Sequence, residues 1–135
     1  MFKGKLGAML YVNDLKHAVE FYREKLGFGF KGYWDNEAHK VEMDWDKAGK
    51  PGYAEVTVGD NGIGLHAAET QRVAGGAVVL HIEVDDVDSY HARLVQAGVT
   101  ATAPGDEPWG ARMFTAKDPD GHEWSFLQIT KRPEH

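Results

Sequence analysis

Apolar residues recur at two different periods along the chain, and the period changes where the secondary structure is expected to change. An apolar stripe at helical spacing runs through residues 15–26 and another through 87–97, which predicts two helices. Each stretch follows an aspartate that can cap a first turn and precedes a glycine that suits a helix end. The aspartates are Asp14 and Asp86, and the glycines are Gly27 and Gly98.

Alternating apolar and polar residues, the period of a half-buried strand, fill most of the remaining chain. An apolar strand precedes each helix, and three strands are expected after it. The expected strands lie at 6–12, 28–34, 41–45 or 53–58, and 63–68 in the first half, and at 78–84, 100–103, 111–116 and 123–129 in the second. Asp60-Asn61-Gly62 predicts a hairpin turn, and Asp118-Pro119-Asp120-Gly121 a second turn with proline and glycine at favoured positions.

The two halves of the chain repeat one unit. Val12-Asn13-Asp14-Leu15 is echoed by Val84-Asp85-Asp86-Val87 at the entry to each helix. The sequence therefore predicts one α+β domain over 1–135, built from two tandem β-α-β-β-β modules at about 5–69 and 77–130. The Gly-rich stretch between the modules is expected to be a linker. Placed side by side, the modules should form a cupped, eight-stranded mixed sheet with a central cleft as the ligand site.

Composition and charge narrow the range of partners. The 135 residues include no cysteine, which excludes a disulfide framework and a thiolate metal site. The net charge is −6 and no basic cluster is present, so no nucleic-acid partner is expected. No apolar run approaches the roughly 18 residues that span a bilayer, and the first residues lack the apolar core of a signal peptide. A cytoplasmic protein without membrane contact is therefore expected.

Short motifs spread over nearly the whole chain resemble those of one superfamily. They are the two helix entries, the Leu26-Gly27-Phe28 helix end, the Trp109-Gly110-Ala111-Arg112 segment and the turn region Asp118–Trp124. With these motifs the chain resembles the vicinal-oxygen-chelate superfamily, which includes glyoxalase I, bleomycin-resistance proteins and extradiol dioxygenases. Because this superfamily hosts several chemistries and also pure binding proteins, the resemblance implies the fold more directly than the reaction.

The resemblance also implies where a metal site would lie. Catalytic members of the superfamily bind one divalent metal with two ligands from each module, usually His and Glu. The matching positions here are Gly7, Gly64, Val79 and Ser125. Three of these residues have no side-chain donor, and serine is a poor ligand, so no metal and no cofactor is expected. The chain fits best the metal-free bleomycin-resistance-like branch, whose members keep the cleft and sequester a drug.

The alternation of a strand assigns its polar residues to one face or the other. Residues two positions away from 7, 64, 79 and 125 should share the cleft-facing side. The expected ligand-binding residues, including a tryptophan at the cleft rim, are Tyr11, His66, His81, Glu83, Trp109, Arg112, Glu123 and Ser125. Glu83 and Glu123 are expected to form a carboxylate pair that a cation stabilises, unless Arg112 pairs with one of them.

Three functions fit this set of residues. The first is binding of a small aromatic or cationic molecule without the usual metal site. The alternative is a divalent-metal-dependent lyase, isomerase or dioxygenase with a relocated metal site formed by His66, His81 and Glu123. A metal-free lyase or isomerase would use His81 or Glu123 as its base, and the sequence assigns no catalytic residue. In each case the unpaired sheet edges favour a homodimer.

Overall fold

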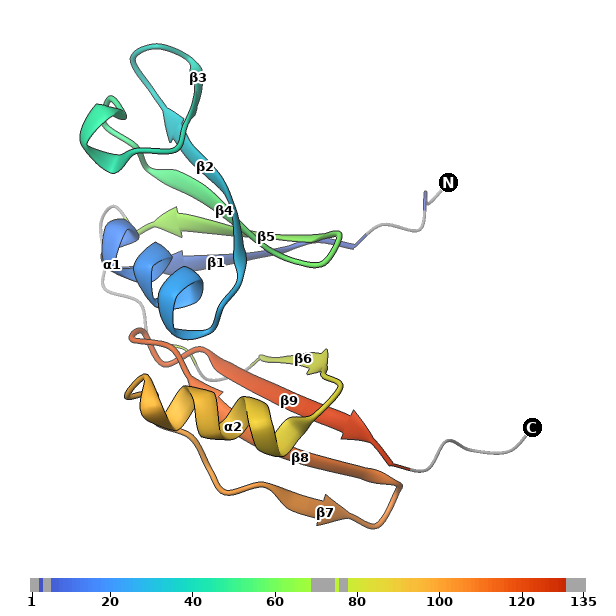
Figure 1. Cartoon of the computed structure of the whole chain (residues 1–135). Helices are drawn as coiled ribbons and strands as arrows, with labels where there is room; N and C mark the ends of the chain where they lie inside the picture. The colour runs from blue at the N-terminus through green and yellow to red at the C-terminus, as the bar shows by residue number, and fades with distance from the viewer. Residues whose placement is uncertain (1–2, 4–5, 69–74, 76–77, 131–135) are drawn as a thin grey trace. The chain divides into compact units, whose positions relative to one another are not determined.

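Two compact units, Met1–Val73 and Ala74–His135, make up the chain (Figure 1). The computed structural model describes residues 3, 6–68, 75 and 78–130. Most of the expected linker lies outside these residues. No helix within the described ranges is long and apolar enough to cross a membrane.

The first unit contains a five-stranded mixed sheet and one principal helix. Its elements are β1 (Ala8–Val12), α1 (Leu15–Glu20), the π turn η1 (Phe21–Lys25), β2 (Gly29–Asp35), β3 (Lys40–Glu42), the 3-10 turn η2 (Trp45–Lys47), β4 (Tyr53–Val58) and β5 (Asn61–Ala67). The strand order is β1-β5-β4-β2-β3, with β1 parallel to β5 and the other pairs antiparallel. Helix α1 packs against β4 and β5.

The second unit repeats this arrangement with four strands. Its elements are β6 (Val79–Glu83), α2 (Val87–Gln96), β7 (Gly105–Glu107), β8 (Ala111–Lys117) and β9 (Glu123–Ile129). The order β6-β9-β8-β7 matches β1-β5-β4-β2, and β6 is again parallel to the last strand. Helix α2 packs against β8 and β9. The chain is therefore an α+β protein of two β-α-β-β-β-like modules, as the sequence predicts.

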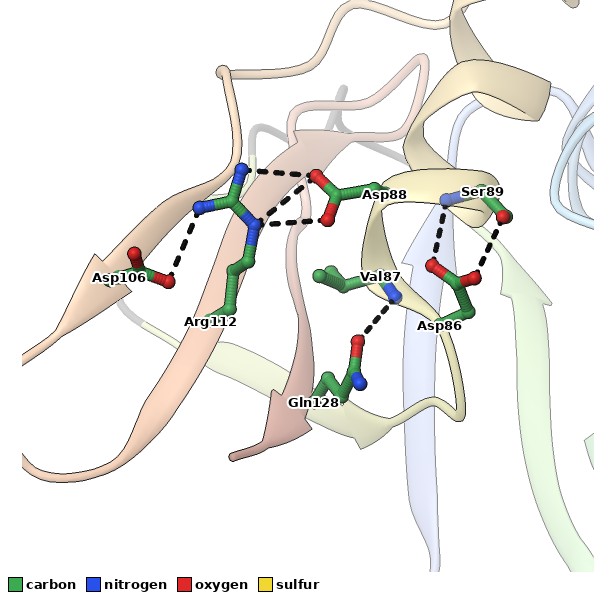
Figure 2. A network of polar contacts seen from close by, with 7 residues as sticks. All are labelled: Asp86, Val87, Asp88, Ser89, Asp106, Arg112 and Gln128. Atoms are coloured by element: carbon green, nitrogen blue, oxygen red, sulfur yellow. Dashed lines mark hydrogen bonds and ion pairs between the residues drawn. The ribbon is translucent and has the colours of Figure 1, made fainter. Parts of the chain in front are cut away.

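Both helices begin at the predicted aspartates. The Asp14 carboxylate accepts a hydrogen bond from the His17 N–H at 3.0 Å, and the Asp86 carboxylate accepts one from the Ser89 N–H at 3.1 Å. The Ser89 hydroxyl donates a further hydrogen bond to Asp86 at 2.9 Å (Figure 2). In addition, the Val87 N–H donates to the Gln128 side chain at 3.0 Å, which ties the first turn of α2 to β9. The bonds from His17, Val87 and Ser89 backbone N–H groups use donors that a helix start leaves unpaired.

The predicted helix over 15–26 is α-helical only as far as Glu20. Its last turn is the π turn η1, closed by a hydrogen bond of 3.1 Å from the Leu26 N–H to the Phe21 carbonyl. Gly27 follows at a φ of +80°, and Gly98 ends α2 at a φ of +81°. Both glycines therefore stand in the left-handed conformation that the sequence predicts for a helix end.

Each helix buries one face of its own sheet. The largest buried side chains of the first unit are Tyr22, Leu65, Val12, Val19 and Val56, and those of the second are Trp124, Phe114, Phe126, Leu94 and Val87. In the second unit the Tyr90 ring of α2 lies 4.9 Å from the Phe126 ring, centre to centre. Burial raises the pKa of Tyr90 to about 12, so this half-buried tyrosine stays a phenol.

The number and position of the strands differ from the prediction. A strand forms at both alternatives in the first half, because β3 overlaps 41–45 and β4 coincides with 53–58. The described residues therefore form nine strands rather than eight. The prediction of a strand at 100–103 is wrong, because only an isolated bridge from Ala101 to Ala116 forms there. Strand β7 begins at Gly105 instead, just after Pro104, which has no N–H to donate to a ladder.

The two predicted turns have different outcomes. Val58 pairs with Asn61, so the hairpin turn consists of Gly59 and Asp60, and the predicted turn residues Asn61 and Gly62 belong to β5. Gly59 has a φ of +56°, which a glycine adopts without strain. The turn at 118–121 is confirmed by a hydrogen bond of 3.0 Å from the Gly121 N–H to the Asp118 carbonyl.

Gly98 and Gly105 offer a matched pair of substitutions. An added Cβ would meet no other atom within 4 Å at either position, but only Gly98 has a positive φ, of +81°. We expect Gly98→Ala to lower the free energy of unfolding by roughly 1–2 kcal/mol, because a side chain is strained in the left-handed region. Gly105→Ala should leave it unchanged or raise it by up to about 1 kcal/mol. Urea denaturation measures both, and equal losses would contradict this explanation.

Asp86 should make stability depend on pH. Hydrogen bonds from the backbone N–H and the hydroxyl of Ser89 hold the pKa of Asp86 below its usual value of 3.8. Because the pKa is lowered on folding, the stabilisation is complete above the unfolded value and disappears as the pH falls through the folded value. We expect Asp86→Ala to lower the melting temperature at pH 7, with a difference from the parent that shrinks below about pH 4. Asp85→Ala, which removes a neighbouring exposed carboxylate, is the control in the same calorimetric scans.

Candidate functional site

In the first unit, three aromatic side chains meet on the sheet face opposite α1. Strand pairing sets Tyr11 of β1 opposite His66 of β5, and His66 opposite Tyr53 of β4. The Tyr11 and His66 rings are 5.4 Å apart at an angle of 57°, and the Tyr53 and His66 rings are 6.4 Å apart at 65°. Tyr11 is 49% exposed, and His66 and Tyr53 are half-buried. We call these three residues the Tyr-His-Tyr cluster.

Tyr11 and His66 are among the ligand-binding residues predicted from the sequence, whereas Tyr53 is not. The Tyr53 ring lies over Gly64, where a Cβ would come within 2.6 Å of the tyrosine hydroxyl oxygen. Burial, and then the negative charge of Glu55, raise the pKa of Tyr53, so its hydroxyl keeps its proton and can donate. Position 64 is one of the four places where the superfamily resemblance implies a metal ligand, and here the tyrosine hydroxyl fills that space.

In the second unit, a row of polar residues crosses the sheet face opposite α2. Ser125 of β9 lies between His81 of β6 and Thr115 of β8. The Ser125 side chain is 1% exposed, and its hydroxyl has no hydrogen-bond partner among the described residues. His81 beside it is exposed. Because buried polar atoms normally have a partner, the Ser125 hydroxyl is an unsatisfied polar group within this row.

Glu83 and Glu123 share this open face but do not form the expected carboxylate pair. Glu83 lies opposite Leu127 of β9, whereas Glu123 starts β9 opposite Val79. Four residues of strand separate the two positions, which corresponds to about 13 Å. Glu83 is exposed and Glu123 is half-buried. A single cation therefore cannot be held between the two carboxylates.

Arg112 and Trp109 lie close together in sequence but in different parts of the β7–β8 hairpin. Arg112 of β8 lies on the face that α2 covers, in the same alternation as the buried Phe114. Its guanidinium binds Asp88 of α2 at 3.0 Å and Asp106 of β7 at 3.2 Å (Figure 2). Arg112 therefore pairs with these two aspartates, and the alternative in which it pairs with Glu83 or Glu123 does not hold. Trp109 stands in the turn between β7 and β8 and is 57% exposed.

One group of residues in the described part of the chain has the composition of a metal site. Asp118, Asp120 and His122 each offer a ligand atom, and these atoms lie within 4.8 Å of one another. However, the Asp118 carboxylate accepts hydrogen bonds from the N–H groups of Asp120 and His122 at 2.9 and 2.8 Å, and lies 2.6 Å from His122 Nδ1. These contacts stabilise the turn before β9, so the fold itself explains why the three side chains lie close together. The residues of the predicted relocated metal site belong to different units, with His66 in the first and His81 and Glu123 in the second.

Comparisons with known proteins agree with this architecture. The family model of the Glyoxalase/Bleomycin resistance protein/Dioxygenase superfamily matches residues 7–126. The Bacillus subtilis (strain 168) protein YraH is 29% identical over 121 residues, which cover 82% of this chain and 87% of YraH. The bleomycin resistance protein of Geobacillus stearothermophilus is 27% identical over 128 residues, 90% of this chain and 94% of that protein. Among solved structures, TnmS3, an antibiotic binding protein from Streptomyces sp. CB03234, matches with a TM-score of 0.68 and 24% identity over 96% of this chain and 99% of TnmS3.

The matched residues include the motifs on which the resemblance depends. Both capped helix entries and the turn at 118–121 fall inside 7–126. The repeated β-α-β-β-β topology is also present in both units. The chain belongs to the Glyoxalase/Bleomycin resistance protein/Dioxygenase superfamily.

Proposed function

We propose that this protein is a cytoplasmic binder of a small aromatic molecule, with a preference for cations, and that it does not use the usual metal site of its superfamily. The observation that carries the proposal is the Tyr53 hydroxyl, which occupies the space of a side chain at Gly64. A ligating Glu or His at this position would collide with it. The other three positions hold Gly7, Val79 and Ser125, which together offer one hydroxyl. This donor set does not fit a divalent ion, which needs several carboxylate or imidazole ligands.

The side chains that replace the metal ligands suit an aromatic ligand. Tyr11, Tyr53 and the half-buried His66 give the first unit an aromatic surface with polar edges. Trp109 adds an exposed indole in the second unit. Aromatic rings bind flat ligands by stacking and edge contacts, and they attract cations to their faces.

Membership of the superfamily supports binding as the activity. A relative of 27% identity, aligned over 90% of this chain, carries the name bleomycin resistance protein. Because the alignment covers nearly the whole of both chains, the likeness extends over both units. We therefore transfer from this relative the binding of a drug-like molecule, but not the identity of that molecule.

Charge favours cations among the possible ligands. The net charge of −6 attracts positive molecules at long range, and Glu83 and Glu123 add negative charge to the open face of the second unit. Since the two carboxylates lie apart, each is expected to act on a ligand separately. The resulting preference should be modest, because partly exposed ion pairs contribute little.

The charge preference can be measured with planar probes of opposite sign. We expect the protein to bind N-methylacridinium more tightly than acridine-9-carboxylate, as followed by the fluorescence of Trp109 and the other tryptophans. Glu83→Gln and Glu123→Gln should each weaken cation binding by about twofold to fivefold. Asp60→Asn, which removes the same charge from an exposed turn of the first unit, should have little effect.

Three outcomes would contradict parts of this proposal. Tighter binding of the anion, or unchanged cation affinity in both glutamate variants, would contradict the role of charge. Loss of probe binding in EDTA, restored by Zn²⁺ or Mn²⁺, would contradict metal-free binding. It would favour the metal-dependent lyase, isomerase or dioxygenase with a relocated site at His66, His81 and Glu123.

A homodimer is the proposed assembly. Within the described residues, β1 and β6 each pair with one strand only, and each carries an exposed apolar side chain, Met9 at 47% and Val79 at 38%. Open edges with apolar residues favour pairing with a second chain. We expect light scattering at tens of micromolar to give twice the 15.0 kDa mass of one chain. Met9→Glu should shift the protein towards monomer, and a monomeric parent would rule the assembly out.

A further inference from the structure

His66 is held in one ring orientation by its neighbour in the chain. Its Nδ1 atom lies 2.8 Å from the Ala67 carbonyl oxygen. A carbonyl oxygen only accepts hydrogen bonds, so Nδ1 must carry a hydrogen. In the neutral imidazole, Nε2 then has no hydrogen and presents a lone pair. The backbone therefore fixes His66 as an acceptor at Nε2.

The surroundings leave this acceptor open to a ligand. No other described residue makes a hydrogen bond with His66, and the ring is half-buried between Tyr11 and Tyr53. The imidazole centre lies 5.4 Å from the Tyr11 ring centre and 6.4 Å from the Tyr53 ring centre, so the edge of a flat ligand in contact with either tyrosine can reach it. A hydrogen-bond donor on that edge would be matched by Nε2, whereas an acceptor placed there would face a lone pair.

We infer that the Tyr-His-Tyr cluster selects aromatic ligands that carry an edge hydroxyl or N–H, with His66 Nε2 as the acceptor of that hydrogen. This inference rests on the proposed binding of an aromatic molecule and names the chemistry that the first unit recognises. His66 is thus a specificity-determining residue. Its contribution is one neutral hydrogen bond in a partly buried place, which corresponds to about fivefold in affinity.

The test compares two neutral probes that differ in one hydrogen-bond donor. 2-Naphthol carries an O–H group. 2-Methoxynaphthalene has the same ring system and oxygen atom, with a methyl group in place of the hydroxyl hydrogen. We expect the full-length protein to bind 2-naphthol about fivefold more tightly by isothermal titration calorimetry. Long-range ¹H–¹⁵N correlation spectra should show His66 with hydrogen on Nδ1, and only 2-naphthol should move its Nε2 resonance. The signal is assigned by its disappearance in His66→Asn.

Two substitutions of His66 separate its two nitrogen atoms. Asparagine places an amide N–H near Nδ1, so His66→Asn keeps the donor to Ala67 and removes the acceptor. We expect this variant to bind both probes equally. Glutamine reaches the position of Nε2 with an amide oxygen, so His66→Gln should keep part of the preference. His39→Asn makes the same substitution at an exposed histidine of the first unit that lies outside the cluster, and it should keep the preference for 2-naphthol.

Each outcome decides between the inference and the proposed function. Equal binding of both probes by the parent, a hydrogen on Nε2 in the spectra, or an unchanged preference in His66→Asn would overturn the inference while leaving aromatic binding intact. If the parent binds neither naphthalene but binds N-methylacridinium, the inference fails and the proposed function stands. If it binds none of these three probes, both fail. Thermal melts of each variant identify any that fails to fold, and for such a variant the spectra of the parent decide the question.

Discussion

One helix for each sheet is the constraint on which the rest of this molecule depends. A sheet has two faces, and α1 and α2 each cover one face of their own unit with an apolar core. The opposite face must then carry side chains that tolerate water or that bind something else. Alternation along the strands enforces the division, because a shift of one residue would exchange the faces. His66 and His81 lie on the open faces because their neighbours Leu65 and Ile82 belong to the covered ones.

The features that the sequence predicts well are those that depend on near neighbours. A capping aspartate bonds an N–H three residues away, and a glycine at a helix end is selected by its own φ, so Asp86 and Gly98 need no knowledge of the rest of the fold. The turn before β9 is equally local, since Asp118 accepts from residues two and four positions further on. Superfamily motifs built from such short segments are therefore recognisable in one sequence.

Features that depend on pairing between distant segments are predicted less well. Tyr53 is missed because the choice of β4 residue that faces His66 follows from the register of β4 against β5, which the turn at Gly59 sets. The separation of Glu83 from Glu123 likewise follows from the register of two strands that lie far apart in the chain. The face of Arg112 was predictable, since the apolar Phe114 lies two residues further along the same strand.

The π turn gives the two repeated units different tolerance to changes in chain length. A hydrogen bond that spans five residues encloses one residue more than the bond of an α-helix. The segment Phe21–Lys25 therefore holds a residue that a regular helix of the same rise would not need. One residue could be lost there while Asp14 and Gly27 keep their places at the two ends. Helix α2 is α-helical throughout and contains no such extra residue. A deletion in it would therefore have to rotate one of its ends.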